Sequence, residues 1–215
     1  MNAAKPLSFY TYECSNADCR FRFPLLAGES ITEACPKCGA SLRDVERPYP
    51  RHLVGKGQVA PRPLEIHVIL DNIRSLYNVG SIFRTAEATG IAKLHLCGMT
   101  ATPENPRLAK TSIGAEQMVA WEQHNNGVVA AEKLRAEGFS LWAIEGGQRS
   151  TPLFEAKMPD EGQRIVLVVG NELAGIDPEI LRIAERVLFI PMQGRKESLN
   201  LTVAFGIAAY FLRFL

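Results

Sequence analysis

Five polar residues of this 215-residue chain stand beside apolar segments, where they could act together on a substrate. They fall in three segments of the sequence. The first segment contains Asn78 and Arg84, six residues apart, the second contains Glu172, and the third contains Ser198 and Asn200. Amides and hydroxyls can orient an acceptor group, and a guanidinium can bind phosphate and stabilise a developing oxyanion. Because a guanidinium stays protonated in proteins, Arg84 is better suited to stabilise charge than to remove a proton.

The second of these places follows an unbroken apolar segment at residues 165–169, which is typical of a buried parallel strand. Gly170, Asn171 and Glu172 come directly after it, and Gly170 would permit close backbone approach to a ligand. The pattern is not Gly-x-Gly-x-x-Gly, so it does not indicate a nicotinamide dinucleotide site. Taken alone, it is equally compatible with an ordinary turn between a strand and a helix.

The third motif runs from Ile190 through Pro-Met-Gln-Gly into Glu-Ser-Leu-Asn-Leu at residues 197–201. Arg195 and Lys196 stand inside this loop, where they either reach phosphate or face solvent. Ligands of parallel sheets bind beyond the carboxyl ends of the strands. We therefore expect this loop and the loop after residue 169 to form one site.

Four N-terminal cysteines have the spacing of a zinc ribbon. They form two pairs, Cys14 with Cys19 and Cys35 with Cys38. Four thiolates in two knuckles are the ligand set of a structural zinc site, and so small a unit needs such a staple to fold. The alternative is a ribbon that no longer binds metal.

The remaining cysteine and the histidines show no such pattern. Cys97 falls in a predicted strand and is expected to be a buried small hydrophobe. The histidines are scattered without ligand spacing, and each is predicted to be an ordinary surface or core residue. They are His52, His67, His95 and His124.

These residues need elements to position them, and strand and helix patterns alternate from Leu64 onward. Gly90 closes the first predicted helix, and Asn78 is the predicted cap at its start. Such alternation predicts an α/β fold with a mostly parallel sheet and helices on both faces. Strands are predicted at 64–70, 92–97, 139–144, 165–169 and 187–190, and helices at 79–86, 128–137, 178–185 and from about 198–200 onward.

Composition divides the chain into three parts. Residues 1–42 hold the four paired cysteines, residues 43–63 are rich in proline and glycine as a linker is, and residues 64–215 carry the α/β pattern. The formal net charge is only +1, but the linker is locally basic. Its arginines and lysine either contact RNA phosphates or face solvent.

Two features of the sequence favour a soluble, cytoplasmic protein. No apolar run reaches the roughly 18 residues that a membrane span needs. The N-terminus also lacks a signal-peptide pattern. In the cytoplasm, paired cysteines bind metal more often than they form disulfides.

The three motifs, in this order and at these distances, resemble the SpoU-type (TrmH-like) branch of the SPOUT RNA 2′-O-methyltransferases. Residues 72–86, 168–172 and 190–201 carry the resemblance, which covers residues 61–215, and residues 110–116 also resemble the family. It implies an enzyme that transfers a methyl group from S-adenosylmethionine to a ribose 2′-hydroxyl of tRNA or rRNA.

The resemblance also implies roles for individual residues. Arg84 matches the catalytic arginine of the family, near the 2′-hydroxyl and phosphate, and Asn78, Ser198 and Asn200 would complete the catalytic group. Six residues would bind the cofactor: Ile144, Gly170, Asn171, Glu172, Ile190 and Leu199.

Members of the family end in a trefoil knot and form homodimers through the last helix, so the resemblance implies both here. Two other functions stay open: an RNA-binding protein of the same fold without activity, and a methyltransferase that modifies an RNA base. Many SpoU-type enzymes carry a different N-terminal extension, so the ribbon bears on the choice of RNA.

Overall fold

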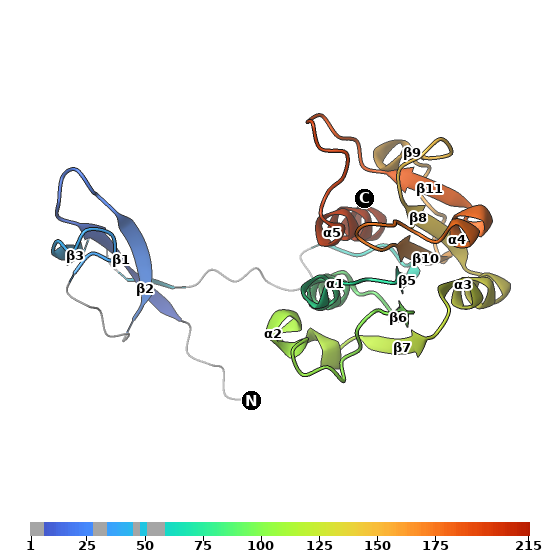
Figure 1. Cartoon of the computed structure of the whole chain (residues 1–215), viewed down its shortest axis with the longest axis horizontal. Coiled ribbons are helices and arrows are strands. Elements are labelled where there is room, and N and C mark those ends of the chain that lie inside the picture. The colour runs from blue at the N-terminus through green and yellow to red at the C-terminus, as the bar shows by residue number, and fades with distance from the viewer. Residues whose placement is uncertain (1–6, 28–33, 45–47, 51–58) are drawn as a thin grey trace. The chain divides into compact units, whose positions relative to one another are not determined.

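The computed structural model describes residues 7–27, 34–44, 48–50 and 59–215 (Figure 1). The chain divides into two compact units, Met1–Gln58 and Val59–Leu215. In the described part of the chain, no helix is long and apolar enough to cross a membrane.

The first unit is a small antiparallel sheet built on β1 (Ser8–Cys14). β1 pairs with β2 (Arg22–Leu26), β3 (Leu42–Asp44) and β4 (Tyr49–Pro50). β3 and β4 therefore bring residues expected in the linker into this sheet. Proline does not prevent this, because Pro50 lies in a two-residue edge strand. Residues 51–58 of the expected linker lie outside the described residues.

The second unit contains a seven-stranded sheet in the order β7-β6-β5-β10-β8-β11-β9, and all its strand pairings are parallel. The α/β fold expected from the sequence is thus confirmed. The pattern did not predict β7 or β9, because β7 carries mostly polar residues and β9 has only two residues. The strands are β5 (Glu65–Asp71), β6 (Lys93–Cys97), β7 (Ala120–His124), β8 (Ser140–Ile144), β9 (Thr151–Pro152), β10 (Arg164–Val169) and β11 (Arg186–Phe189).

Helices cover both faces of this sheet (Figure 1). α1 (Leu76–Thr89) and α5 (Leu201–Phe214) pack together over one apolar cluster. α3 (Gly127–Ala136) and α4 (Pro178–Ile183) pack over a second cluster on the opposite face. The segment that resembles the family at residues 110–116 forms the end of α2 (Ala109–Ser112) and the start of the short helix η1 (Ala115–Gln117).

Helix α1 begins earlier than its apolar pattern indicates. Ser75 is the N-cap, and its side chain accepts a hydrogen bond from the backbone N–H of Asn78 at 3.3 Å. The prediction that Asn78 caps this helix is therefore wrong, since Asn78 lies inside the first turn and its side chain is used elsewhere. Gly90 ends the helix in the left-handed conformation (φ 63°), as predicted.

A buried arginine anchors the C-terminal helix. The Arg213 guanidinium donates to the backbone carbonyls of Arg62, Leu64, Thr89 and Gly90 at 2.7–2.9 Å. Burial lowers the pKa of Arg213, but these four acceptors stabilise its charge. The end of α5 is thereby joined both to the end of α1 and to the segment that enters β5.

Candidate active site

A pocket of about 640 Å³ lies beyond the carboxyl ends of β8, β10 and β11. Ligands bind at this place in parallel α/β sheets, and the volume lies within the range of about 300–1,000 Å³ that small-molecule sites occupy. The structure brings eight of the ten residues proposed from the sequence for catalysis or cofactor binding to its lining. They are Ile144, Gly170, Asn171, Glu172, Ile190, Ser198, Leu199 and Asn200.

Glu172 links this pocket to helix α1. Its carboxylate accepts hydrogen bonds from the backbone N–H groups of Arg74 and Ser75 at 2.9 and 3.0 Å, and from Asn78 Nδ2 at 2.8 Å. Partial burial acts to raise the pKa of Glu172, but these hydrogen bonds outweigh it and hold the pKa below its usual value. The carboxylate therefore stays ionised and fixes the start of α1 against the pocket.

Asn171 stabilises the loop after β10 rather than facing open solvent. Its Oδ1 accepts from the backbone N–H groups of Leu173 and Ala174 at 2.9 and 3.0 Å. Its Nδ2 donates to the backbone carbonyl of Asn72 at 2.7 Å. The side chain thus joins the loop after β10 to the loop after β5.

Gly170 is required by the loop itself. A Cβ at this position would lie 2.4 Å from the backbone carbon of Gly175 and 2.4 Å from the nitrogen of Ile176. The space that a Cβ would fill is therefore occupied by the chain itself, which forms a bridge between Asn171 and Gly175. Gly170 also lines the pocket, so its close approach to a ligand stays a prediction.

Glu145 is a pocket residue that sequence reasoning missed. It follows β8, and its Oε2 accepts from the backbone N–H of Ile176 at 3.2 Å. A Cβ at Gly175, which has φ 76°, would lie 2.6 Å from the same oxygen. A lone glutamate after a strand carries no distinctive pattern, so only the strand order could have placed it here.

The last wall of the pocket is the segment between β11 and α5. Asn200 is the N-cap of α5, and its Oδ1 accepts from the backbone N–H and the hydroxyl of Thr202 at 2.9 and 2.6 Å. Ser198 is exposed at the pocket surface. Ile144 and Ile190 pack against the apolar cluster beneath. The pocket therefore combines an apolar floor with polar groups at its mouth.

The two remaining predicted residues lie on helix α1, outside the pocket lining. Asn78 is one hydrogen bond from the pocket, through Glu172. Arg84 is exposed and stands about 9 Å farther along the helix axis, given the rise of 1.5 Å per residue. Within one chain, the structure does not bring Arg84 to the pocket.

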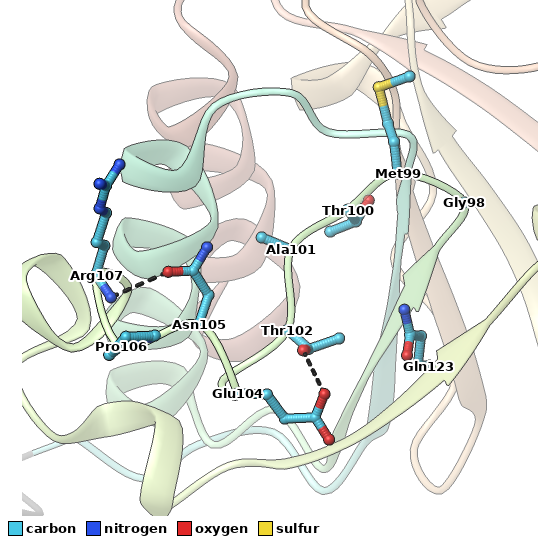
Figure 2. Close-up of a pocket in the computed structure, with 10 residues that line it drawn as sticks. All are labelled: Gly98, Met99, Thr100, Ala101, Thr102, Glu104, Asn105, Pro106, Arg107 and Gln123. Carbon is cyan, nitrogen blue, oxygen red and sulfur yellow. Dashed lines mark hydrogen bonds between the residues drawn. The ribbon is translucent and has the colours of Figure 1, made fainter.

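A second pocket, of about 680 Å³, follows β6 (Figure 2). Its polar groups bond to one another: Thr102 Oγ1 donates to Glu104 Oε2 at 3.4 Å, and the Arg107 backbone N–H donates to Asn105 Oδ1 at 3.1 Å. It contains none of the residues proposed from the sequence, so we assign the candidate active site to the first pocket. Its lining consists of Gly98, Met99, Thr100, Ala101, Thr102, Glu104, Asn105, Pro106, Arg107 and Gln123.

The four N-terminal cysteines come together in the first unit. Cys14 Sγ lies 3.4 Å from Cys38 Sγ, and Cys19 Sγ lies 3.9 Å from Cys35 Sγ. All four sulfurs lie within 4.8 Å of one another. Thiolates around one zinc ion at about 2.3 Å would be separated by about 3.8 Å, so the donor set fits a tetrahedral ion.

Comparison with known proteins assigns the second unit to a family. The model of the SpoU rRNA Methylase family matches residues 65–210. A tRNA (guanosine(18)-2′-O)-methyltransferase of Aquifex aeolicus is 33% identical over 150 residues, which are 69% of each chain. A 23S rRNA (guanosine(2553)-2′-O)-methyltransferase of Bacillus subtilis is 30% identical over 146 residues, which are 68% of this chain and 57% of the relative.

A solved structure shows the same likeness in three dimensions. The structure of an AdoMet-bound rRNA methyltransferase from Sinorhizobium meliloti has a TM-score of 0.65 and 26% identity. The similarity covers 81% of this chain and 64% of that one.

Proposed function

Because the chain belongs to the SpoU rRNA methylase family, we propose that it is an enzyme that methylates a ribose 2′-hydroxyl of tRNA or rRNA with S-adenosylmethionine. The observation that carries the proposal is the gathering of eight of the predicted site residues at one pocket beyond three strand ends. Relatives named as tRNA and rRNA 2′-O-methyltransferases support the substrate class.

The lining of this pocket suits S-adenosylmethionine. Ile144, Ile190 and Leu199 offer apolar surface for the adenine ring, and the loop at 170–175 offers backbone groups. When bound, the cofactor supplies a methyl group on a positively charged sulfur, which is readily transferred. The protein needs to align that group with the acceptor oxygen, and alignment alone contributes on the order of 7–11 kcal/mol.

The acceptor oxygen becomes negatively charged as its proton leaves, so it needs donors and a cation nearby. Ser198 and Asn200, both exposed on the pocket, would hydrogen-bond the ribose. Arg84 would bind the adjacent phosphate and stabilise the alkoxide. Asn78 would act indirectly, by holding Glu172 and the start of α1.

In this proposal the protein is a homodimer, and the Arg84 of one chain lies at the pocket of the other. Helix α5 carries an exposed apolar strip of Val203 and Tyr210, seven residues apart on one helical face, and Ala204 beside it lines the pocket. A second chain on this strip would lie next to the pocket mouth. We infer that it contributes its Arg84 there.

Mixing two inactive variants tests this arrangement. Arg84→Ala loses the arginine, and Leu199→Arg blocks the cofactor pocket. If subunits exchange at random, half of the dimers are mixed and each has one intact site, so about a quarter of the wild-type activity returns. Mixed dimers that stay inactive would show that each site uses the Arg84 of its own chain.

The proposal includes a trefoil knot near the C-terminus, as in the family. Two observations support it: the loops at 170–175 and 190–200 line the same pocket, and α5 then returns to pack on α1. A knotted segment holds both loops in place, which would preform the cofactor site.

The first unit would bind zinc through Cys14, Cys19, Cys35 and Cys38. The separations of their sulfur atoms, 3.4 Å for Cys14–Cys38 and 3.9 Å for Cys19–Cys35, support this proposal. Gly39, with φ 76°, follows the second knuckle and allows the tight turn there.

The same unit would help to bind RNA. One face of its sheet carries Tyr12 and Phe23 as cross-strand neighbours, and the ring centroid of Phe21 lies 5.3 Å from that of Phe23. Arg20 and Arg43 are mostly exposed. Aromatic rings stack on bases and arginines bind phosphate, so this surface suits single-stranded RNA better than an apolar protein partner.

Transfer of a labelled methyl group from S-adenosylmethionine to bulk tRNA and to bulk rRNA tests the proposed function. We expect label in one RNA class with the wild-type protein and none with Leu199→Arg. Cofactor binding without transfer to either class would favour the alternative of an inactive RNA-binding protein.

A further inference from the structure

Three of the four histidines form one contiguous cluster, although their sequence positions look scattered. His67 Nδ1 lies 3.1 Å from His95 Nε2, and His95 Nδ1 lies 2.9 Å from His124 Nε2. They come from the neighbouring strands β5, β6 and β7. The sequence predicted ordinary surface or core histidines and did not predict that these three contact one another, while His52 lies outside the described residues.

The hydrogen bonds of this cluster have a defined direction. Glu65 Oε1 lies 3.3 Å from His67 Nε2 and can only accept, so that nitrogen carries the proton. His67 Nδ1 then accepts from His95 Nε2, which leaves the lone pair of His95 Nδ1 pointing at His124.

Two further atoms that can coordinate a metal ion lie near Nδ1 of His95. His124 Nε2 is 2.9 Å away, and Glu122 Oε1 lies 4.0 Å from His124 Nε2. The three ligand atoms of His95, His124 and Glu122 lie within 4.8 Å of one another. Ligands around a tetrahedral zinc ion with bonds of about 2.05 Å are separated by about 3.3 Å, which falls between these two distances.

We propose that His95, His124 and Glu122 bind a divalent transition-metal ion, with zinc as the best match to two imidazoles and one carboxylate. His67 and Glu65 form the outer shell that orients His95. A metal-bound histidine usually donates its second N–H to such a partner. The ion would join β6 to the edge strand β7, so its role is structural. This inference does not depend on the proposed enzymatic activity.

The surroundings of the cluster allow an ion to enter. The His124 side chain is 16% exposed and that of Glu122 is 41% exposed, whereas His95 is 3% exposed. A water molecule can therefore complete the coordination from the solvent side. Two lysines oppose a cation here: Lys93 Nζ lies 3.4 Å from Glu122 Oε2, and Lys133 acts on the charge of Glu122. We therefore expect micromolar rather than picomolar affinity.

Metal counting on the full chain tests this site. The protein is dialysed against zinc at about ten times the expected micromolar dissociation constant, and bound zinc is measured per chain by mass spectrometry. We expect two equivalents in the wild type, one in the ribbon and one in the histidine cluster. His124→Ala should retain one equivalent, and the matched control His52→Ala should retain two.

A second variant protects the test against misfolding. Glu122→Gln preserves the side-chain shape and should weaken the second equivalent at least about tenfold, with an unchanged circular dichroism spectrum. Zinc should also raise the melting temperature of the wild-type second unit but not that of His124→Ala. A wild-type zinc content that neither His124→Ala nor Glu122→Gln lowers would overturn the proposal, whether or not the ribbon also binds zinc.

Discussion

The two units of this chain are stabilised in different ways. The second unit has apolar clusters on both faces of its sheet, with large side chains such as Trp142, Phe83 and Phe205 fully buried. In the described part of the first unit, the buried apolar residues are Cys14 and Cys35, both of which belong to the proposed zinc site. Hydrophobic burial can therefore hold the second unit, whereas the first would depend on the proposed zinc ion.

Removal of zinc should give the largest difference in stability between the two units. Structural zinc contributes about 10–16 kcal/mol in small zinc-dependent folds, far more than the first unit can gain from its apolar surface. A tight chelator should abolish the dispersed NMR signals of residues 8–26 and 34–44 and leave the α/β signals outside β6 and β7 in place. A first unit that stays folded without metal would contradict the claim that the two units are stabilised in different ways.

A substitution of Arg213 should have the next largest effect, and only on the second unit. Arg213→Met leaves four backbone carbonyls without their donor, two of them fully buried and two partly buried, so we expect a loss of about 4 kcal/mol in unfolding free energy. The matched control is Arg182→Met, which removes an exposed ion pair with Glu179 and should cost less than about 0.5 kcal/mol. Chemical denaturation measures both, and equal losses would contradict the anchoring role.

Substitution of Arg84 should lower the catalytic rate without lowering stability. This result would distinguish residues that stabilise the fold from residues that take part in catalysis. Arg84 is exposed, so Arg84→Ala should leave the melting temperature unchanged and lower the transfer rate about 10²–10³-fold. Glu87→Ala, an exposed position on the same helix, serves as the control. Arg84→Lys should also be slow, because one ammonium group cannot reproduce the planar guanidinium fork.

Substitution of Glu172 should have the smallest effect, a loss of stability whose size depends on pH. The pKa of Glu172 is lower in the folded state than in the unfolded state. Its contribution to the unfolding free energy is therefore fully present above the unfolded-state pKa of about 4.3 and is lost as the pH falls through the folded-state pKa. Since Glu172 is exposed and screened, Glu172→Gln should lose about 1 kcal/mol near pH 7. The difference from wild type should shrink below pH 4, and a difference that is constant from pH 7 to pH 3 would contradict this account.

The sequence predicted the pocket because its residues follow strand ends. The carboxyl ends of parallel strands meet at one edge, so the loops after β10 and β11 had to be neighbours. Local detail was harder to predict: Ser75 rather than Asn78 caps α1, because the helix extends beyond its apolar pattern. Gly170 was recognised by type, yet the backbone it approaches belongs to its own loop.

The histidine cluster shows what the sequence alone could not reveal. His95 and His124 belong to adjacent strands, and β7 was not predicted from its polar composition. Strand register sets which side chains meet, and no spacing rule along the chain encodes it. A metal site on one helix or in two knuckles has a spacing that can be recognised in the sequence, whereas a site whose ligands lie on two neighbouring strands does not.

The product of the reaction tests the central claim most directly. A methyl group on the 2′-oxygen removes the nucleophile that alkali uses to cleave the RNA chain, so a labelled ribose resists hydrolysis at that position. After transfer from labelled S-adenosylmethionine and complete alkaline digestion, we predict that the label appears in dinucleotides with the wild-type protein and is lost with Arg84→Ala. Label in mononucleotides would mean that a base is methylated and would contradict the assignment to a ribose oxygen.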